Sequence, residues 1–455
     1  MEWETRIRRD GLAPRHDLEP EPLLDFMYRQ GVPGVGVALI ENGDIAWARG
    51  YGVRERGGEP VTPDTIFQAG SVSKPVTAVA VMRLVQEGRL DLDRDVNEYL
   101  TTWKVPPNGD WQPHITLRRL LCHGAGMTVH GFPGYNRSRP VPTVPQILDG
   151  IPPANTPSVH VSGIPGAQFR YSGGGTTIVQ QVLIDALGKP FPQIMRETVL
   201  EPTGMEHSTY EQPLPERWWG QASTGHRTAA VPVEGGWHVY PEMAAAGLWT
   251  TPADLCRLAI DLQRSWAGET DRLLRPETVR EMLSPQVEKQ IGIGFFLDGE
   301  GSAMRFGHSG SDEGFVCELT AYRERGQGAA VMTNCDSGYS VFRGVLHTLA
   351  REYGWPDYPP PDRTREAPDP AEAARCAGEY SLDSGLRLTV AATGEGLTLQ
   401  PDGQPSFPLY RSGELTYLAD AVHAEVLFKP GENGTITGLQ LDQGDGAREG
   451  RRIEP

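Results

Sequence analysis

A serine and a lysine that could act together in covalent catalysis lie three residues apart, at Ser71 and Lys74. Residues at this spacing share one face of a helix, so the two side chains can meet. An ammonium buried at the root of an apolar helix is costly to keep charged, and a neutral amine there could accept the serine proton. The amino end of a helix also stabilises a developing oxyanion. The alternative is a helix-capping serine beside a solvent-exposed lysine.

Two further short motifs could add to this chemistry. Tyr171 follows a loop rich in Gly and Pro and precedes a predicted helix, where its phenol could relay the serine proton. His308-Ser309-Gly310 precedes a predicted strand, Phe315–Tyr322, and its small residues would let a substrate backbone approach closely. The alternatives are a core tyrosine with a satisfied hydroxyl and a turn with an incidental histidine.

The strands that would position these groups are indicated near both ends of the first 350 residues. An Asn-Gly-Asp turn at residues 42–44 lies between the apolar runs Val35–Glu41 and Ile45–Gly50, which predicts a β-hairpin. Strand patterns dominate again over residues 292–333. We expect these two sets of strands to share one antiparallel sheet.

The helix that carries the serine and the lysine is predicted over Ser71–Gln86, with Pro75 in its first turn, where a missing N–H is harmless. Residues 76–85 are apolar on nearly all sides, so we expect this helix to be buried. Residues 101–165 are rich in Pro, Gly and His and are predicted to be irregular. Further helical patterns lie at Thr176–Leu187, Phe191–Leu200, Pro252–Ser265 and Ser340–Tyr353.

The pattern changes near residue 355. Residues 356–370 are rich in proline and predict an extended, semi-rigid linker. Residues 371–455 contain short β runs separated by Gly, Asp and Asn, which predict a small antiparallel barrel or sandwich. The expected organisation is an α+β catalytic domain over residues 1–355, a linker over 356–370 and a β-domain over 371–455. The α+β part would hold an antiparallel sheet flanked by helices and an all-helical subdomain.

Composition and charge argue against several classes of binding partner and site. The chain has 455 residues and a formal net charge of −17, so it should repel nucleic acid and anionic membranes. Its apolar runs are far shorter than the roughly 20 residues of a membrane-spanning helix. Five scattered cysteines without CxxC spacing argue against structural disulfides and a zinc site. No apolar core follows the charges of the first eleven residues, so we expect no secretory signal and a cytoplasmic location.

The order and spacing of the three motifs resemble the serine β-lactamase and penicillin-binding protein superfamily. The resemblance is strongest to its class C-like branch, which includes esterases and D-amino-acid peptidases, and it covers roughly residues 20–350. The phrases FQAGSVSK at 67–74, GRLDLD at 88–93, LLCHGAG at 120–126 and EPTGM at 201–205 support it. The tail resembles the lipocalin-like β-domain that some members carry, with Cys376–Tyr380 similar to its opening.

The resemblance implies a role for each matched residue. Ser71 would be the nucleophile that forms an acyl-enzyme. Lys74 and Tyr171 would share the general acid/base work, and which of them is the base stays open. The oxyanion hole would consist of the backbone N–H groups of Ser71 and Ser311.

Two departures from the family pattern affect the expected substrate. His308, Ser309 and Gly310 would line the strand along which the substrate lies, but true β-lactamases carry Lys at the first of these positions. A neutral imidazole binds a substrate carboxylate less tightly than an ammonium does. Gly173 stands where the second motif usually ends in Asn or Ser, so a side-chain contact to the substrate amide is missing. Both departures point away from efficient β-lactam hydrolysis.

The predicted function is therefore a serine hydrolase that cleaves a carboxylic ester or a D-configured peptide amide, with weak β-lactam hydrolysis. Tyr135 and Trp237 are candidates to line its acyl pocket; the alternative is that they pack in the core. No step needs a metal or another cofactor, and His114, His123 and His130 lack metal-ligand spacing.

The expected partner is a small-molecule ester, peptide or β-lactam, not a nucleic acid or a membrane, and a homo-oligomer is compatible with the sequence. Two other functions stay open. Acyl-Ser71 could pass its acyl group to an amine, as in an acyltransferase or peptide cyclase. The chain could also be a penicillin-binding protein that acylates without turnover.

Overall fold

The computed structural model of the protein describes residues 3–7, 21–358, 366, 369–383, 385–393, 396–419, 424–431, 433–442 and 447–453. The chain divides into two compact units, residues 24–342 and residues 343–455 together with the first 23. Most of the predicted linker and of the N-terminal segment lies outside the described residues. The domain boundaries at 355 and 370 and the absence of a secretory signal therefore stay predictions.

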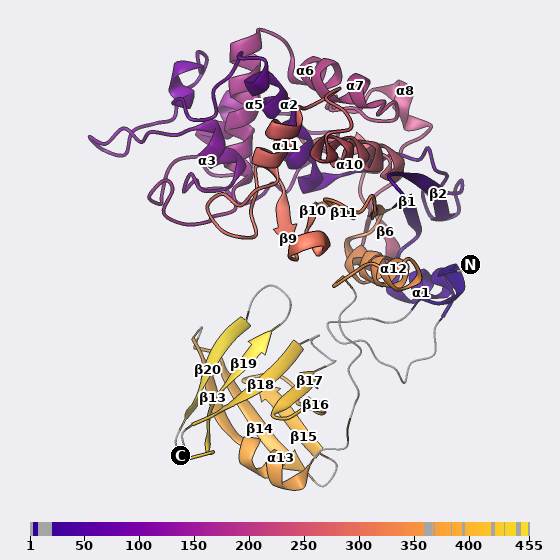
Figure 1. Ribbon diagram of the computed structural model, residues 1–455, viewed down its shortest axis with the longest axis vertical. Coiled ribbons are helices and arrows are strands. Elements are labelled where there is room, and N and C mark those ends of the chain that lie inside the picture. The colour runs from indigo at the N-terminus through magenta and orange to yellow at the C-terminus, as the bar shows by residue number, and fades with distance from the viewer. Residues whose placement is uncertain are drawn as a thin grey trace. The chain divides into compact units, whose positions relative to one another are not determined.

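A six-stranded antiparallel sheet is the frame of the larger unit, with strand order β2-β1-β12-β11-β10-β9 (Figure 1). The strands are β1 (Gly34–Glu41), β2 (Asp44–Gly52), β9 (Phe296–Asp298), β10 (Arg305–Asp312), β11 (Phe315–Tyr322) and β12 (Gly328–Thr333). Val35 of β1 lies opposite Thr333 of β12. The prediction that strands from both regions share one antiparallel sheet is confirmed.

The predicted hairpin is the β1–β2 pair. Its turn residues Asn42 and Gly43 have φ angles of 54° and 74°. This left-handed conformation suits Asn-Gly in a two-residue hairpin turn, because both residues adopt positive φ at little steric cost.

Two long helices pack in the larger unit. Helix α10 (Pro252–Ala267) contacts β1, β2, β11 and β12, and its N-cap Thr251 accepts a hydrogen bond from the backbone N–H of Asp254. Helix α2 (Ser73–Gln86) is buried at every position from Ser73 to Met82. The predicted buried helix therefore exists, but it begins two residues after Ser71, because a 3-10 turn precedes it.

The remaining helices of this unit gather around α5 (Gly173–Leu187). Helices α3 (Leu117–Leu121), α4 (Val144–Asp149) and α6 (Phe191–Met195) pack against α5, and α9 (Met243–Ala246) contacts both α5 and α2. This arrangement is the predicted helical subdomain. No helix among the described residues has both the length and the apolar character needed to cross a membrane.

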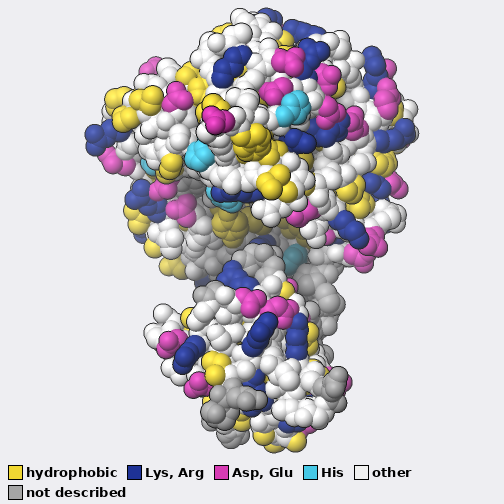
Figure 2. All heavy atoms as spheres, turned by 90° about the vertical axis from the view of Figure 1, so that its left-hand side faces the viewer, with side chains coloured by type: hydrophobic (Ala, Val, Ile, Leu, Met, Phe, Trp, Pro, Cys, Tyr) yellow, Lys and Arg dark blue, Asp and Glu magenta, His cyan; other side chains and the backbone are white. Residues whose placement is uncertain are grey.

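Shorter elements connect these parts. The other helices are α1 (Leu23–Gln30), α7 (Glu201–Thr203), α8 (Glu216–Trp219), α11 (Pro276–Met282) and α12 (Tyr339–Glu352). Two-residue strands are β3 (Phe67–Gln68), β4 (Tyr135–Asn136), β5 (His226–Arg227), β6 (Val231–Pro232), β7 (His238–Val239) and β8 (Trp249–Thr250). Figure 2 shows acidic and basic side chains interspersed over one face of the larger unit.

The C-terminal residues form a closed eight-stranded antiparallel barrel that follows α13 (Pro370–Cys376). Its strands are β13 (Gly378–Leu382), β14 (Arg387–Thr393), β15 (Gly396–Pro401), β16 (Phe407–Gly413), β17 (Thr416–Ala419), β18 (Ala424–Pro430), β19 (Ile436–Asp442) and β20 (Ala447–Ile453). Along β18, Ala424, Val426 and Phe428 are buried and alternate with more exposed neighbours, the period of a strand with one buried face. The predicted small antiparallel barrel is confirmed.

Candidate active site

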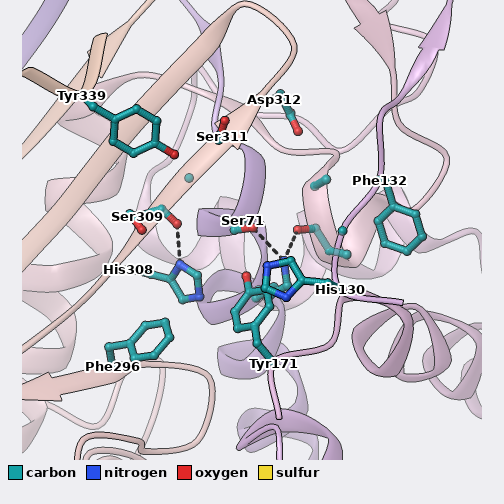
Figure 3. Close-up of a pocket in the computed structure, with 15 residues that line it drawn as sticks. Ser71, His130, Phe132, Tyr171, Phe296, His308, Ser309, Ser311, Asp312 and Tyr339 are labelled. Atoms are coloured by element: carbon teal, nitrogen blue, oxygen red, sulfur yellow. Dashed lines mark hydrogen bonds between the residues drawn. The ribbon is translucent and has the colours of Figure 1, made fainter. Parts of the chain in front are cut away.

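Ser71 and Lys74 meet where the buried helix begins. Ser71 lies in the 3-10 turn η2 (Gly70–Val72), and Lys74 lies in the first turn of α2. The Nζ of Lys74 donates to the Oγ of Ser71 at 2.9 Å and to the carbonyl oxygen of Ala245 at 2.9 Å (Figure 3). Lys74 is only 4% exposed. The amino group therefore contacts the serine hydroxyl and is shielded from water, as a base for the serine proton must be.

Tyr171 reaches the same place from the amino end of α5. Ser172 caps this helix, since its Oγ accepts the backbone N–H of Gly175 at 2.9 Å. Tyr171 is the residue before this cap, and it lies beside the start of α2. The Nζ of Lys74 is 5.0 Å from the centroid of the Tyr171 ring. Two residues almost 100 positions apart are thus neighbours.

His123 makes three contacts with Tyr171 and its two chain neighbours. Its carbonyl oxygen accepts the N–H of Arg170 at 2.8 Å, and its Nδ1 accepts the N–H of Ser172 at 3.2 Å. The centroids of the His123 and Tyr171 rings are 4.3 Å apart. Burial, aided by the charge of Lys74, lowers the pKa of His123 well below its ordinary value, so its ring is neutral and Nδ1 can accept. His123 has a left-handed backbone, with φ of 56°, which is uncommon outside glycine.

Strand β10 supplies the third motif. Its side chains alternate, so that His308, Gly310 and Asp312 are buried while Ser309 and Ser311 are exposed. The period of two in a strand puts the three buried residues on one face. This face is turned toward the η2 turn, with which β10 is in contact.

Two glycines allow β10 and η2 to touch backbone to backbone. A Cβ atom on Gly310 would lie 2.0 Å from the carbonyl oxygen of Ala69, and one on Gly70 would lie 2.6 Å from the nitrogen of Ser311. Gly70 also has a φ of 48°, which favours glycine. The backbone next to Ser71 and the backbone of Ser311 therefore lie side by side, as an oxyanion hole built from both N–H groups requires.

His308 is a neutral imidazole. It is 4% exposed, and burial followed by the nearby charge of Lys74 lowers its pKa to about 3. Its Nδ1 is within hydrogen-bond distance of the carbonyl oxygen of Ser309, and its Nε2 has no hydrogen-bond partner among the described residues. When Nδ1–H donates to that carbonyl, Nε2 keeps a lone pair that can accept a hydrogen bond. At neutral pH, His308 therefore contributes no positive charge.

The three motifs border one cavity of about 380 Å³ (Figure 3). Of the predicted site residues, seven line it: Ser71, Lys74, Tyr171, His308, Ser309, Gly310 and Ser311. The rest of the lining, which the sequence did not predict, is His130, Gly131, Phe132, Ala245, Ala246, Phe296, Asp312 and Tyr339. Among the Lys, Arg, Asp and Glu side chains of the described segment 21–358, those in the lining are Lys74 and Asp312.

A sequence signal for one of these additional residues did exist. Strand alternation starting from His308 puts residue 312 on the same face, so Asp312 could have been proposed from the strand pattern alone. His130 and Phe132 offered no such signal, because they lie in the loop between α3 and β4. The segment 101–165 was predicted to be irregular throughout, but it contains the helices α3 and α4.

Gly173 does not belong to the cavity lining. A Cβ atom on Gly173 would lie 2.9 Å from the Phe132 ring and 3.1 Å from the carbonyl oxygen of His130. His130 and Phe132 pack over Gly173. They line the cavity, whereas Gly173 does not. The space that a side chain at this position would need is therefore already filled by an aromatic ring.

Tyr135 and Trp237 also lie outside the lining. Tyr135 is 5% exposed, and its hydroxyl accepts the backbone N–H of Asn155 at 3.1 Å. The Trp237 ring packs 5.3 Å from the Trp249 ring, between centroids, and the Arg137 guanidinium lies 4.3 Å from its centroid. Both aromatic residues are packed in the protein interior, the alternative that the sequence had left open.

The three histidines of the irregular segment have separate surroundings. His114 lies beside Asp95, with 3.2 Å between Nδ1 and the carboxylate, whereas His123 supports Tyr171 and His130 lines the cavity. Within the described ranges, no three or more His, Cys, Asp or Glu side chains are grouped as metal ligands would be.

Comparison with known families matches residues 22–351 to the family described as Beta-lactamase. The chain belongs to the beta-lactamase family. The predicted family and its fold are thereby confirmed.

Individual relatives agree with this assignment. The chain is 30% identical to a beta-lactamase of Pseudomonas fluorescens over 52% of its own length and 61% of that protein. It is 29% identical to esterase EstB of Burkholderia gladioli over 41% of its length and 49% of that protein. It thus spans less than two thirds of either relative. The structure of the octameric penicillin-binding protein homologue from Pyrococcus abyssi shares the fold, with a TM-score of 0.63, 22% identity and coverage of 94% of this chain and 98% of the other.

Proposed function

We propose that this member of the beta-lactamase family forms an acyl-enzyme on Ser71 and cleaves a carboxylic ester or a D-configured peptide amide. The observation that carries the proposal is the 2.9 Å contact between Lys74 Nζ and Ser71 Oγ, inside a cavity bordered by β10. The similarity to a protein named an esterase supports an ester as substrate.

The first step would be attack of Ser71 Oγ on the scissile carbonyl carbon. A neutral Lys74 amine that donates one N–H to the carbonyl of Ala245 keeps its lone pair for the serine proton. Tyr171, beside Lys74, could take or pass on the same proton. The leaving alcohol or amine departs with a proton, and a water molecule, activated by the same groups, then releases the acid and restores Ser71.

The backbone N–H groups of Ser71 and Ser311 would stabilise the oxyanion that forms in both steps. Support comes from the close packing of Gly70 against Ser311, which leaves the two backbone segments adjacent. Such donors act strongly in a cavity from which water is partly excluded.

The charge of the cavity favours substrates without a carboxylate near the scissile bond. His308 is neutral at any pH well above 3, and the amino group of Lys74 is already in contact with Ser71 and Ala245. A substrate carboxylate would lose its hydration without gaining a partner of opposite charge. We therefore infer weak activity on β-lactams compared with neutral esters.

A substrate panel with mass detection tests the proposal. The purified protein would be mixed with p-nitrophenyl esters, D-aminoacyl p-nitroanilides and nitrocefin, with and without D-alaninamide as an amine acceptor. We expect acylation of Ser71 and release of the free acid. An adduct that persists without turnover would favour a penicillin-binding protein, and an amide product with D-alaninamide that exceeds the acid would favour acyl transfer. No adduct with any substrate would reject the proposal.

A further inference from the structure

Asp312 is a carboxyl group in the cavity that the proposed reaction does not use. It lies on β10 directly after Ser311, is 5% exposed and lines the cavity. Among the described residues, neither of its oxygens has a hydrogen-bond partner. Burying a carboxyl group without a partner costs free energy, so such a group in a cavity calls for a ligand that pairs with it.

The neighbours of Asp312 do not supply that pair. Burial raises the pKa of Asp312 well above its ordinary value, and the charge of Glu242 raises it further, while the charge of Lys74 lowers it. Lys74 directs its hydrogen bonds at Ser71 and not at Asp312. A cation bound beside Asp312 would favour its charged form and offset the cost of burying it.

The position of Asp312 indicates which part of a substrate it would meet. In Figure 3, Asp312 and His308 lie on opposite sides of Ser71, and the carboxyl end of Asp312 points toward the Ser71 side. The backbone N–H of Ser311 would hold the carbonyl oxygen, and Cα atoms of neighbouring residues are about 3.8 Å apart. An amino group on the carbon next to the scissile carbonyl, two bonds from the carbonyl carbon, could therefore reach Asp312 in the cavity lining.

Besides hydroxyl groups that can donate or accept, the lining contains two groups that could accept hydrogen bonds from a substrate. His308 Nε2 keeps a free lone pair, and Asp312 has two free oxygens. A substrate that carries a hydrogen-bond donor with positive charge matches this lining, whereas one with a carboxylate does not.

We propose that Asp312 is the subsite for a primary ammonium on the acyl part of the substrate, so that the preferred substrates are aminoacyl esters and amides with a free amino group. The proposal rests on the proposed acyl-Ser71 reaction and narrows its substrate class. The ammonium would donate to the Asp312 carboxylate while the carbonyl oxygen occupies the oxyanion hole.

Two substrates of nearly equal shape isolate the contribution of the ammonium. Alanine p-nitroanilide, in its D and L forms, and 2-methylpropanoyl p-nitroanilide differ by an ammonium in place of a methyl group. The kcat/KM ratio of the two would be measured at pH 6.5, where an α-amino group with a reference pKa of about 7.7–8.0 is mostly protonated. Intrinsic reactivity differences cancel when this ratio is compared between variants.

The variant Asp312→Asn keeps the shape of the side chain and removes its charge. We expect it to lower the ratio by at least about tenfold, as the loss of a charge-assisted hydrogen bond in a shielded site would. Asp261→Asn is the matched control, because Asp261 is also a buried aspartate but pairs with Arg272 and lies outside the cavity lining. Its ratio should stay within about twofold of the wild type.

The outcomes separate the two proposals. A ratio unchanged in Asp312→Asn would overturn the ammonium subsite while leaving acyl-Ser71 chemistry intact. If the wild type cleaves neither p-nitrophenyl 2-methylpropanoate nor alanine p-nitroanilide, the proposed function itself is rejected, and the subsite with it. Should Asp312→Asn fail to fold, inhibition of wild-type ester hydrolysis decides. Alaninamide should then inhibit at a concentration at least about tenfold lower than 2-methylpropanamide, and equal inhibition would overturn the subsite.

Discussion

The barrel and the cavity of the larger unit differ in whether their buried polar groups have hydrogen-bond partners. In the barrel unit, Glu372 of α13 accepts from Arg411 Nε at 2.9 Å and from the Tyr417 hydroxyl at 2.9 Å. The Tyr380 hydroxyl donates to the carbonyl oxygen of Cys376 at 2.7 Å. Every buried side-chain nitrogen or oxygen in the described residues 369–453 has a hydrogen-bond partner.

Around Ser71 the situation is reversed. Among the described residues that line the cavity, His308 Nε2 and both carboxyl oxygens of Asp312 have no hydrogen-bond partner. Each such group costs about 1–3 kcal/mol. Polar groups in the barrel are therefore paired with one another, whereas His308 and Asp312 at the cavity could still pair with a ligand. Substitutions at the cavity should thus change rates, and substitutions in the barrel should change stability.

The largest effect should come from Ser71→Ala. We expect turnover of p-nitrophenyl esters to fall by at least about 10⁴-fold and the acyl adduct to disappear, because the nucleophile is gone. The melting temperature should stay close to that of the wild type. Ser337→Ala is the matched control, since Ser337 lies outside the cavity lining, and it should keep full activity. An acyl adduct on Ser71→Ala would show that another residue is the nucleophile.

Lys74→Ala and Tyr171→Phe should each lower kcat by at least about 100-fold, the lower end for general acid–base groups. Because both residues would act on the same serine proton, the double variant should lower kcat by far less than the product of the two single effects. Steady-state kinetics on one neutral ester measures all three. A single variant with near-wild-type kcat would remove that residue from the proton path.

Glu372→Ala tests the barrel side of the comparison. It leaves Arg411 and Tyr417 without their shared acceptor, so the unfolding free energy of the barrel should fall by about 1–3 kcal/mol. The exposed Glu379 of β13 is the matched control, and Glu379→Ala should change it by at most about 0.5 kcal/mol. Urea unfolding would measure both. A loss of kcat/KM on a neutral ester in folded Glu372→Ala would contradict the separation of stability and rate.

Glu242→Gln should show a stability difference that depends on pH. Burial raises the pKa of Glu242 to about 8, above its ordinary value of 4.5. The folded protein therefore holds a proton that the unfolded chain loses above about pH 4.5, and wild-type stability declines as the pH rises from about 5 through 8. Glutamine does not titrate, so the variant should gain about 1–3 kcal/mol relative to the wild type between pH 5 and pH 9. Denaturant unfolding at pH 5, 7 and 9 would detect this gain, and a constant difference would refute it.

The smallest effect should come from His308→Lys. A lysine adds a cation where the wild type has none at neutral pH, so kcat/KM for nitrocefin relative to a neutral ester should rise about three- to tenfold at pH 8. The variant His308→Gln stays neutral and should leave the ratio unchanged. An unchanged or lower ratio in His308→Lys would mean that this residue does not face the substrate carboxylate. For the wild type, the pKa of about 3 predicts no rate step from His308 between pH 6 and pH 8.

Local sequence patterns were enough to predict the helices and strands whose residues show a clear hydrophobic period. The hairpin at 42–44, the buried helix after Ser71 and the short β runs of the barrel follow from turn residues and hydrophobic spacing. Strand β20 (Ala447–Ile453) was missed, because four of its seven residues are Arg or Glu and only Gly450 is buried. Its pairing with β13 and β19 makes it a strand and closes the barrel.

The sequence by itself determined which reactive groups exist and that Ser71 and Lys74 could meet, because residues three apart in a helical segment share one face. Only the tertiary structure decided that Tyr171 and His308 join them, that His130 and Phe132 cover Gly173, and that Asp312 is left without a partner. The physical reason is that contacts between distant segments depend on how the whole core packs. Burial, which sets the charge of His308, is a property of that packing and not of any local motif.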